Sequence, residues 1–108
     1  MDEWARKGAT LSDKTARVEF GLTEQQIEDA IRAGNLQYRS ASMHGSPWLR
    51  LLRREVENLV RTTQGDRYLR QRQAQAELAG VNRELKRLRA QLAELEQRRS
   101  TLTAQLKG

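Results

Sequence analysis

The chain has 108 residues, 37% of them hydrophobic and 31% charged, so it can form one small core plus an extension. It has no cysteine and a single histidine, which excludes disulfides and thiolate metal sites and argues against any histidine-ligated metal. No segment approaches the roughly 18 apolar residues of a membrane span, and residues 1–9 lack the apolar core of a signal peptide. We therefore expect a cytoplasmic protein with no membrane segment.

The net charge of +6 is unevenly distributed. Residues 1–66 hold ten Lys or Arg and ten Asp or Glu, whereas residues 67–108 hold ten and four. Within the neutral half, the segment from Ala30 to Arg54 contains five arginines and no acid. The sequence thus predicts a basic patch inside a neutral domain, followed by a basic tail.

Two short helices are indicated by their capping residues. Ser12 is expected to cap the first helix. Thr23 is expected to cap the second, with Gln26 completing a capping box, and Gly34 is expected to end that helix after Ala33. Helical spacing assigns these side chains to the buried stripe of the second helix: Ile27, Ala30 and Ile31. The outward side chains are Gln25, Glu28, Asp29 and Arg32.

A β-hairpin is predicted next, with strands on either side of "MHGS" and a turn at His44-Gly45. The expected register sets Tyr38 opposite Leu51 and Arg39 opposite Arg50. It gives an inward face composed of Leu36, Tyr38, Leu49 and Leu51. Like charges facing each other across strands are unfavourable unless something anionic lies between them.

A third helix, "RREVENLV", is expected to close the head with Val56, Leu59 and Val60 pointing inward. Gly65 is a candidate C-cap for this helix, and Asp66 is a candidate N-cap for the next one. The resulting organisation is an N-terminal extension over residues 1–10, a head over residues 11–62 and a long helix over residues 66–107. The expected fold is mainly α with one β-hairpin.

The tail is predicted to be a coiled coil because its apolar residues alternate spacings of three and four. The seam consists of Leu78, Val81, Leu85, Leu88, Leu92, Leu95, Leu102 and Leu106, with Arg99 filling one position. Such a stripe needs a partner helix, and a second copy of the chain is the simplest one. An antiparallel dimer removes the Arg99–Arg99 contact of a parallel one; a hetero-coil or a larger bundle stays open.

Residues 11–36 resemble the helix-turn-helix of the MerR and phage-excisionase group. The matching residues are Leu11, Ser12, Ala16, Gly21, Leu22, Thr23, Ile27, Ile31, Gly34 and Leu36. The stretch "HGSPWLRLLRREVE" also resembles the DNA-binding part of xeroderma pigmentosum group A-type repair proteins, although their zinc module cannot exist here without cysteine. Together the resemblances cover about half of the chain. They imply a winged helix-turn-helix head that binds double-stranded DNA through the second helix and the wing.

The residue chemistry gives the wing the larger part in this expectation. On the second helix, Gln25 and Arg32 are candidates for base contacts and Thr23 for a phosphate contact. Glu24, Glu28 and Asp29 would repel phosphates, and their alternative interpretation is a set of surface pairs. The wing candidates for phosphate binding are Arg39, Arg50, Arg53 and Arg54. The alternative for these arginines is a solvated edge that keeps the hairpin soluble.

These patterns support two functions. The first is a homodimeric DNA-binding protein, a transcriptional regulator or architectural factor. The second is a non-catalytic adaptor that uses the winged head for protein contacts and the coiled coil for assembly. No paired acids, nucleophile–base set or phosphate loop stands out, so we expect neither an enzyme nor a cofactor.

Overall fold

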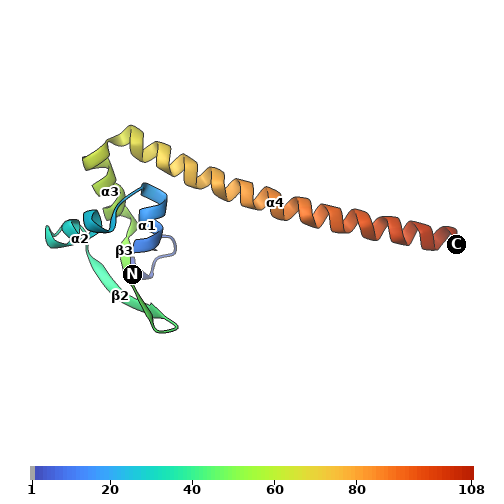
Figure 1. Ribbon diagram of the computed structural model, residues 1–108, viewed down its shortest axis with the longest axis horizontal. Coiled ribbons are helices and arrows are strands. Elements are labelled where there is room, and N and C mark those ends of the chain that lie inside the picture. The colour runs from blue at the N-terminus through green and yellow to red at the C-terminus, as the bar shows by residue number, and fades with distance from the viewer. Residues whose placement is uncertain (1) are drawn as a thin grey trace. The chain divides into compact units, whose positions relative to one another are not determined.

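A computed structural model describes residues 2–108 of the chain. The protein is mainly helical, with one small antiparallel sheet and a long C-terminal helix (Figure 1). It divides into two compact units, Met1–Ala74 and Gln75–Gly108. The elements in chain order are the 3₁₀ helix η1 (Glu3–Ala5), β1 (Thr10–Ser12), α1 (Asp13–Phe20), α2 (Glu24–Arg32), β2 (Tyr38–Met43), β3 (Ser46–Leu52), α3 (Arg53–Gln64) and α4 (Asp66–Lys107).

The predicted helix caps of the first unit, hereafter the head, are confirmed. The Ser12 hydroxyl accepts the Thr15 amide hydrogen at 3.0 Å before α1. Before α2, Thr23 and Gln26 form the full capping box, with bonds of 3.1 and 2.8 Å. Gly34 follows the end of α2 with a φ of +82°, a conformation that glycine adopts without strain.

The hairpin has the predicted register, with Arg39 opposite Arg50 and Tyr38 opposite Leu51. The sheet has a third strand, however, because β1 pairs antiparallel with β3 and gives the order β1-β3-β2. The expectation of a two-stranded hairpin was therefore incomplete. A segment of three residues is too short to show a period-2 pattern, so β1 has no recognisable signal in the sequence.

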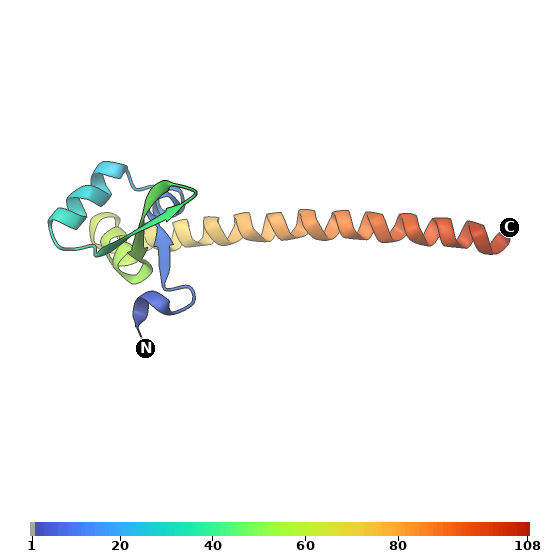
Figure 2. The same cartoon turned by 90° about the horizontal axis from the view of Figure 1, so that it is seen from below.

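The core of the head lies between the helices and β3. Its buried side chains are Leu11, Ala16, Phe20, Leu22, Ile27, Ala30, Leu36, Leu51, Val56, Val60 and Leu69. The inward assignment of Tyr38 is wrong, because this residue is 51% exposed. The helices α1 and α3 pack on the central strand β3, and Tyr38 lies on β2, at the edge of the sheet. In Figure 2, η1 (dark blue) and α2 (cyan) lie on opposite sides of the head.

The junction between α3 and α4 is formed by Gly65. Its amide donates to the Arg61 carbonyl, and its own carbonyl accepts the Leu69 amide hydrogen, so one glycine ends α3 and begins α4. Asp66 is already helical, and the prediction that it caps α4 is wrong. The side chain of Asp66 instead pairs with Arg61 at 2.9 Å.

The first turns of α4 are bound to the end of α1 within the head. The Tyr68 hydroxyl donates to the Phe20 carbonyl at 3.0 Å. Arg72 donates to the carbonyls of Glu19 and Val18 at 3.0 and 2.8 Å. These side chains satisfy carbonyls that the end of a helix leaves without partners, and so anchor α4 to α1.

Candidate nucleic-acid interface

Arg39 and Arg50 form the centre of the predicted interface. They are direct partners in the β2–β3 register, so their side chains leave the same face of the sheet. The guanidinium carbons lie 4.6 and 5.8 Å from the centre of the Trp4 ring, within the range of cation–π attraction. One indole ring thus attracts two like charges that would otherwise repel each other.

Polar groups of the N-terminal segment complete the coordination of this pair. Arg39 Nη1 donates to Asp2 Oδ2 at 3.3 Å. Arg50 Nη2 donates to the backbone carbonyl of Trp4 and lies 3.5 Å from Thr10 Oγ1. The anionic counterpart that the cross-strand pair requires therefore comes from the chain itself.

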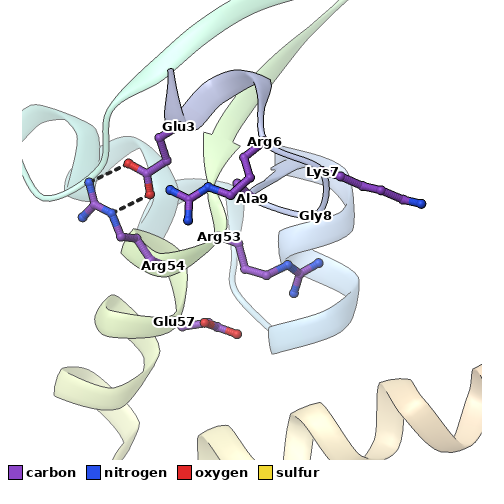
Figure 3. A pocket seen from close by; sticks show the side chains of 8 residues that line it. All are labelled: Glu3, Arg6, Lys7, Gly8, Ala9, Arg53, Arg54 and Glu57. Atoms are coloured by element: carbon purple, nitrogen blue, oxygen red, sulfur yellow. Dashed lines mark hydrogen bonds and ion pairs between the residues drawn. The ribbon is translucent and has the colours of Figure 1, made fainter. Parts of the chain in front are cut away.

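Arg54 is bound to Glu3 of the same segment. Its Nε and Nη2 donate to the two carboxylate oxygens at 2.7 and 3.0 Å, a bidentate pair drawn with dashed lines in Figure 3. The hydrogen bonds from Arg54 hold the pKa of Glu3 below its ordinary value. The same pairing raises the pKa of Arg54 above the usual value of its guanidinium.

Arg53 forms a more enclosed pair with Glu19 of α1. Its two terminal nitrogens donate to the Glu19 carboxylate at 2.9 and 3.3 Å. The side chains are 32% and 16% exposed, against 51% and 54% for Arg39 and Asp2. Arg53 therefore fixes α3 against α1 and is less accessible to a ligand than Arg39.

A hollow of about 540 Å³ lies beside these pairs, between the turn after η1 and the start of α3. Its lining includes Arg6, Lys7, Arg53 and Arg54, together with Glu3 and Glu57. In Figure 3 the Arg6 side chain extends across the hollow toward α3, while Lys7 extends outward. The hollow adds two cations that the prediction of the interface did not include.

The second-helix candidates are exposed, and each already has a partner on or beside its own helix. Thr23 caps its own helix. The Gln25 amide donates to Asp29 at 2.8 Å, and Arg32 lies 3.8 Å from the same carboxylate. Because α2 and η1 lie on opposite sides of the head (Figure 2), these candidates are separated from the arginine pairs around η1.

The side chains predicted for dimerisation are all exposed in the described chain. The eight are Leu78, Val81, Leu85, Leu88, Leu92, Leu95, Leu102 and Leu106. They lie on α4, where Glu84 and Arg87 form a pair one helical turn apart. That pairing lowers the pKa of Glu84 and raises that of Arg87.

Asp2, Glu3 and Trp4 were not among the predicted site residues and were assigned only to the N-terminal extension. Trp4 is buried, as is Leu52, and neither belongs to the main core cluster. Leu52 alternates with Leu51 along β3 and so lies on the face opposite the core, the same face as Arg50, which contacts Trp4. The available signal was the unfavourable Arg39–Arg50 pair together with two acids and a tryptophan at the start of the sequence.

Within residues 2–108, no helix combines the length and apolar character needed to cross a membrane. The same residues contain no group of three or more His, Cys, Asp or Glu placed to hold a metal ion. No protein-family model matches the chain, and no curated protein or solved structure matches it either.

Proposed function

We propose that the chain is a homodimeric DNA-binding protein with a winged helix-turn-helix head and a coiled-coil tail. The observation that carries this proposal is the concentration of Arg39, Arg50 and Arg54 on one side of the head. Their partners come from a short N-terminal segment. Three guanidinium groups so close together suit the phosphates of a nucleic-acid backbone.

The pairs that hold these arginines are weak enough to exchange for phosphate. The Arg39–Asp2 pair is about half exposed on both sides, and in the Arg54–Glu3 pair the side chains are 62% and 27% exposed. An ion pair as exposed as Arg39–Asp2 contributes about 0–1 kcal/mol in water. A DNA backbone that replaces the carboxylates also releases condensed counterions, which favours the exchange at low salt.

In this proposal the second helix, which lies on the opposite side of the head from η1, has only a secondary role near the major groove. Its outward face presents Gln25 and Arg32 beside Glu24, Glu28 and Asp29. The acids limit how closely the helix approaches a phosphate backbone. We therefore expect most of the affinity to come from the wing and few base contacts from α2.

The exposed apolar stripe of α4 supports the dimer. Seven of its eight side chains are between 41% and 60% exposed, and Leu106 is 89% exposed. A helix with such a stripe gains stability by burying it against a second one. Two copies would present two heads, which favours a symmetric or repeated DNA site.

A mobility-shift titration across salt concentrations tests the proposal. We expect affinity for a random duplex to fall steeply with salt, and Arg39→Ala/Arg50→Ala to lose more affinity than Gln25→Ala. The control variant, Arg83→Ala/Arg98→Ala, removes the same charge from α4, where neither residue has an ion pair among the described residues. Equal losses in the two double variants would show that only net charge matters and would contradict binding through the wing.

The second candidate function is a non-catalytic adaptor that uses the head for protein contacts, and one combined observation favours it. Each wing arginine already has a partner within the head, and the face of α2 is acidic. That combination suits a basic protein surface docking on α2. Capture of such a partner, lost in Glu24→Gln/Glu28→Gln, together with no duplex shift at low salt, would favour the adaptor.

A further inference from the structure

The N-terminal acidic segment, residues 2–4, offers the wing arginines the same groups that a nucleic-acid strand offers. Asp2 and Glu3 present carboxylates to Arg39 and Arg54, as a backbone presents phosphates. Trp4 presents an aromatic face and a carbonyl to the arginine pair, as a base does. The carboxylates of Asp2 and Glu3 therefore occupy positions that the phosphates of the proposed ligand require.

The segment is fixed in place by Trp4 rather than by its acids. Trp4 is 7% exposed, whereas the side chains of Asp2 and Glu3 are 54% and 27% exposed. Asp2 also accepts the Trp4 amide hydrogen at 3.2 Å and so caps η1. Because both acids directly precede the buried ring, they can leave the arginines while Trp4 stays packed on the sheet.

Covalent attachment makes these acids effective competitors. Groups tethered by a short chain act at effective concentrations in the millimolar range, although each single pair is weak. An isolated anion would have to displace one carboxylate without compensation from a neighbouring contact. A chain of linked phosphates can replace both carboxylates in a single binding event.

We propose that Asp2 and Glu3 act as a built-in competitor that holds Arg39 and Arg54 until a polyphosphate backbone displaces both carboxylates. This inference rests on the proposed DNA-binding function and adds its regulation. It assigns residues 2 and 3 to control of the interface and Trp4 to anchoring them there. The competitor sets a threshold: the head discriminates a nucleic-acid strand from single anions.

The test compares two full-length variants that each remove two negative charges. Asp2→Asn/Glu3→Gln removes the competitor and keeps Trp4. Glu94→Gln/Glu96→Gln is the matched control, because both glutamates are exposed on α4 and neither has an ion pair among the described residues. Affinity for a random duplex is measured by fluorescence anisotropy at low salt, with circular dichroism to confirm equal folding.

We expect the N-terminal variant to bind about three- to tenfold more tightly than the wild-type protein, and clearly more tightly than the control. Equal gains in the two variants would overturn the competition and leave DNA binding intact. Weaker binding by the N-terminal variant would also overturn it, because the acids would then support the interface. If neither the wild-type protein nor the N-terminal variant binds any duplex, both the proposed function and this inference are wrong.

A second measurement follows Glu3 directly. Carbon-detected NMR titration of the Glu3 carboxyl should show its pKa returning upward when the protein is saturated with duplex, because Arg54 is no longer its partner. Glu84, whose pKa is lowered by Arg87, is the internal reference. A lowered Glu3 pKa that persists in the complex would show that the pair stays closed and would overturn the proposal.

Discussion

Arg50 donates a hydrogen bond to the Trp4 carbonyl while its guanidinium lies 5.8 Å from the centre of the Trp4 ring. Trp4 thus contacts β3, the central strand of the sheet, through both its backbone carbonyl and its ring. Arg39 approaches the same ring from β2. The N-terminal segment is therefore an integral part of the head.

Trp4→Ala should destabilise the head by about 2–4 kcal/mol, because it removes a large buried ring. It also removes the aromatic ring that attracts both Arg39 and Arg50. Trp48→Ala, at a partly exposed position on β3, is the comparison and should cost less. Urea unfolding followed by circular dichroism measures both. Equal losses of unfolding free energy in the two variants would mean that the N-terminal segment is only loosely attached to the head.

The Arg53–Glu19 pair should couple more strongly than the Arg39–Asp2 pair. Its bidentate geometry and lower exposure predict a coupling free energy of about 1–2 kcal/mol, against at most about 0.5 kcal/mol for the exposed pair. Two double-mutant cycles to alanine, read by chemical denaturation, give both values. A larger coupling free energy for Arg39–Asp2 than for Arg53–Glu19 would contradict a structural role for Arg53 between α1 and α3.

Gly21→Ala should loosen the attachment of α4 to α1. Gly21 has a φ of +70°, and an added Cβ would lie 2.8 Å from the Tyr68 hydroxyl. Backbone strain alone costs about 1 kcal/mol, so we expect a total of about 2–3 kcal/mol. Gly34→Ala isolates the strain, since its φ is +82° and no atom lies within 4 Å of the added Cβ.

The same experiment in a Tyr68→Phe background separates the two causes. Without the hydroxyl, the cost of Gly21→Ala should fall toward that of Gly34→Ala. Thermal unfolding of the four variants and the wild-type protein provides the comparison. An unchanged cost would assign the whole effect to the backbone.

Acid should release the Arg54–Glu3 pair. Arg54 lowers the pKa of Glu3 in the folded protein, whereas in the unfolded chain this carboxyl has its ordinary pKa of 4.5. The stabilisation is therefore complete above that pH and is lost as the pH falls through the lowered folded value. Thermal melts of the wild-type protein and Glu3→Gln should differ at neutral pH and converge in acid, below the folded pKa of Glu3. A difference that persists there would contradict this assignment.

The tail stripe predicts opposite effects from two substitutions on α4. Leu92→Asp places a charge at the middle of the proposed seam and should shift the protein toward monomer. Arg99→Leu completes the apolar stripe and should tighten association at least about tenfold, or about 1.4 kcal/mol. Sedimentation equilibrium over a range of concentrations measures both. No response to either change would exclude this face from assembly.

The helix caps and the hairpin register could be predicted because they depend on neighbouring residues. A capping box such as Thr23–Gln26 is a local pattern, and the alternation around His44-Gly45 determines which strand residues face each other. The position of Tyr38 could not be predicted in the same way. Its exposure depends on which strand the helices cover, and that is decided by packing across the whole head.

The N-terminal contacts could not be predicted, because they connect residues 37 to 51 positions apart. No local pattern in residues 2–4 indicates those partners. The sequence did indicate that Arg39 and Arg50 need an anionic neighbour, and it left open whether that neighbour is a ligand or the chain. The pairing of these two arginines was thus identified correctly, while the groups bound to them came from an unexpected segment.

The anchoring of α4 by Tyr68, Leu69 and Arg72 has a practical consequence for handling the protein. A fragment cut at residue 62 would lack a core leucine and three hydrogen bonds to the end of α1. One that starts at residue 11 would lose the Asp2 carboxylate that pairs with Arg39 and the Trp4 carbonyl that accepts from Arg50. A fragment of residues 1–74, the first compact unit, keeps all of these contacts and omits the exposed apolar stripe of α4 beyond it.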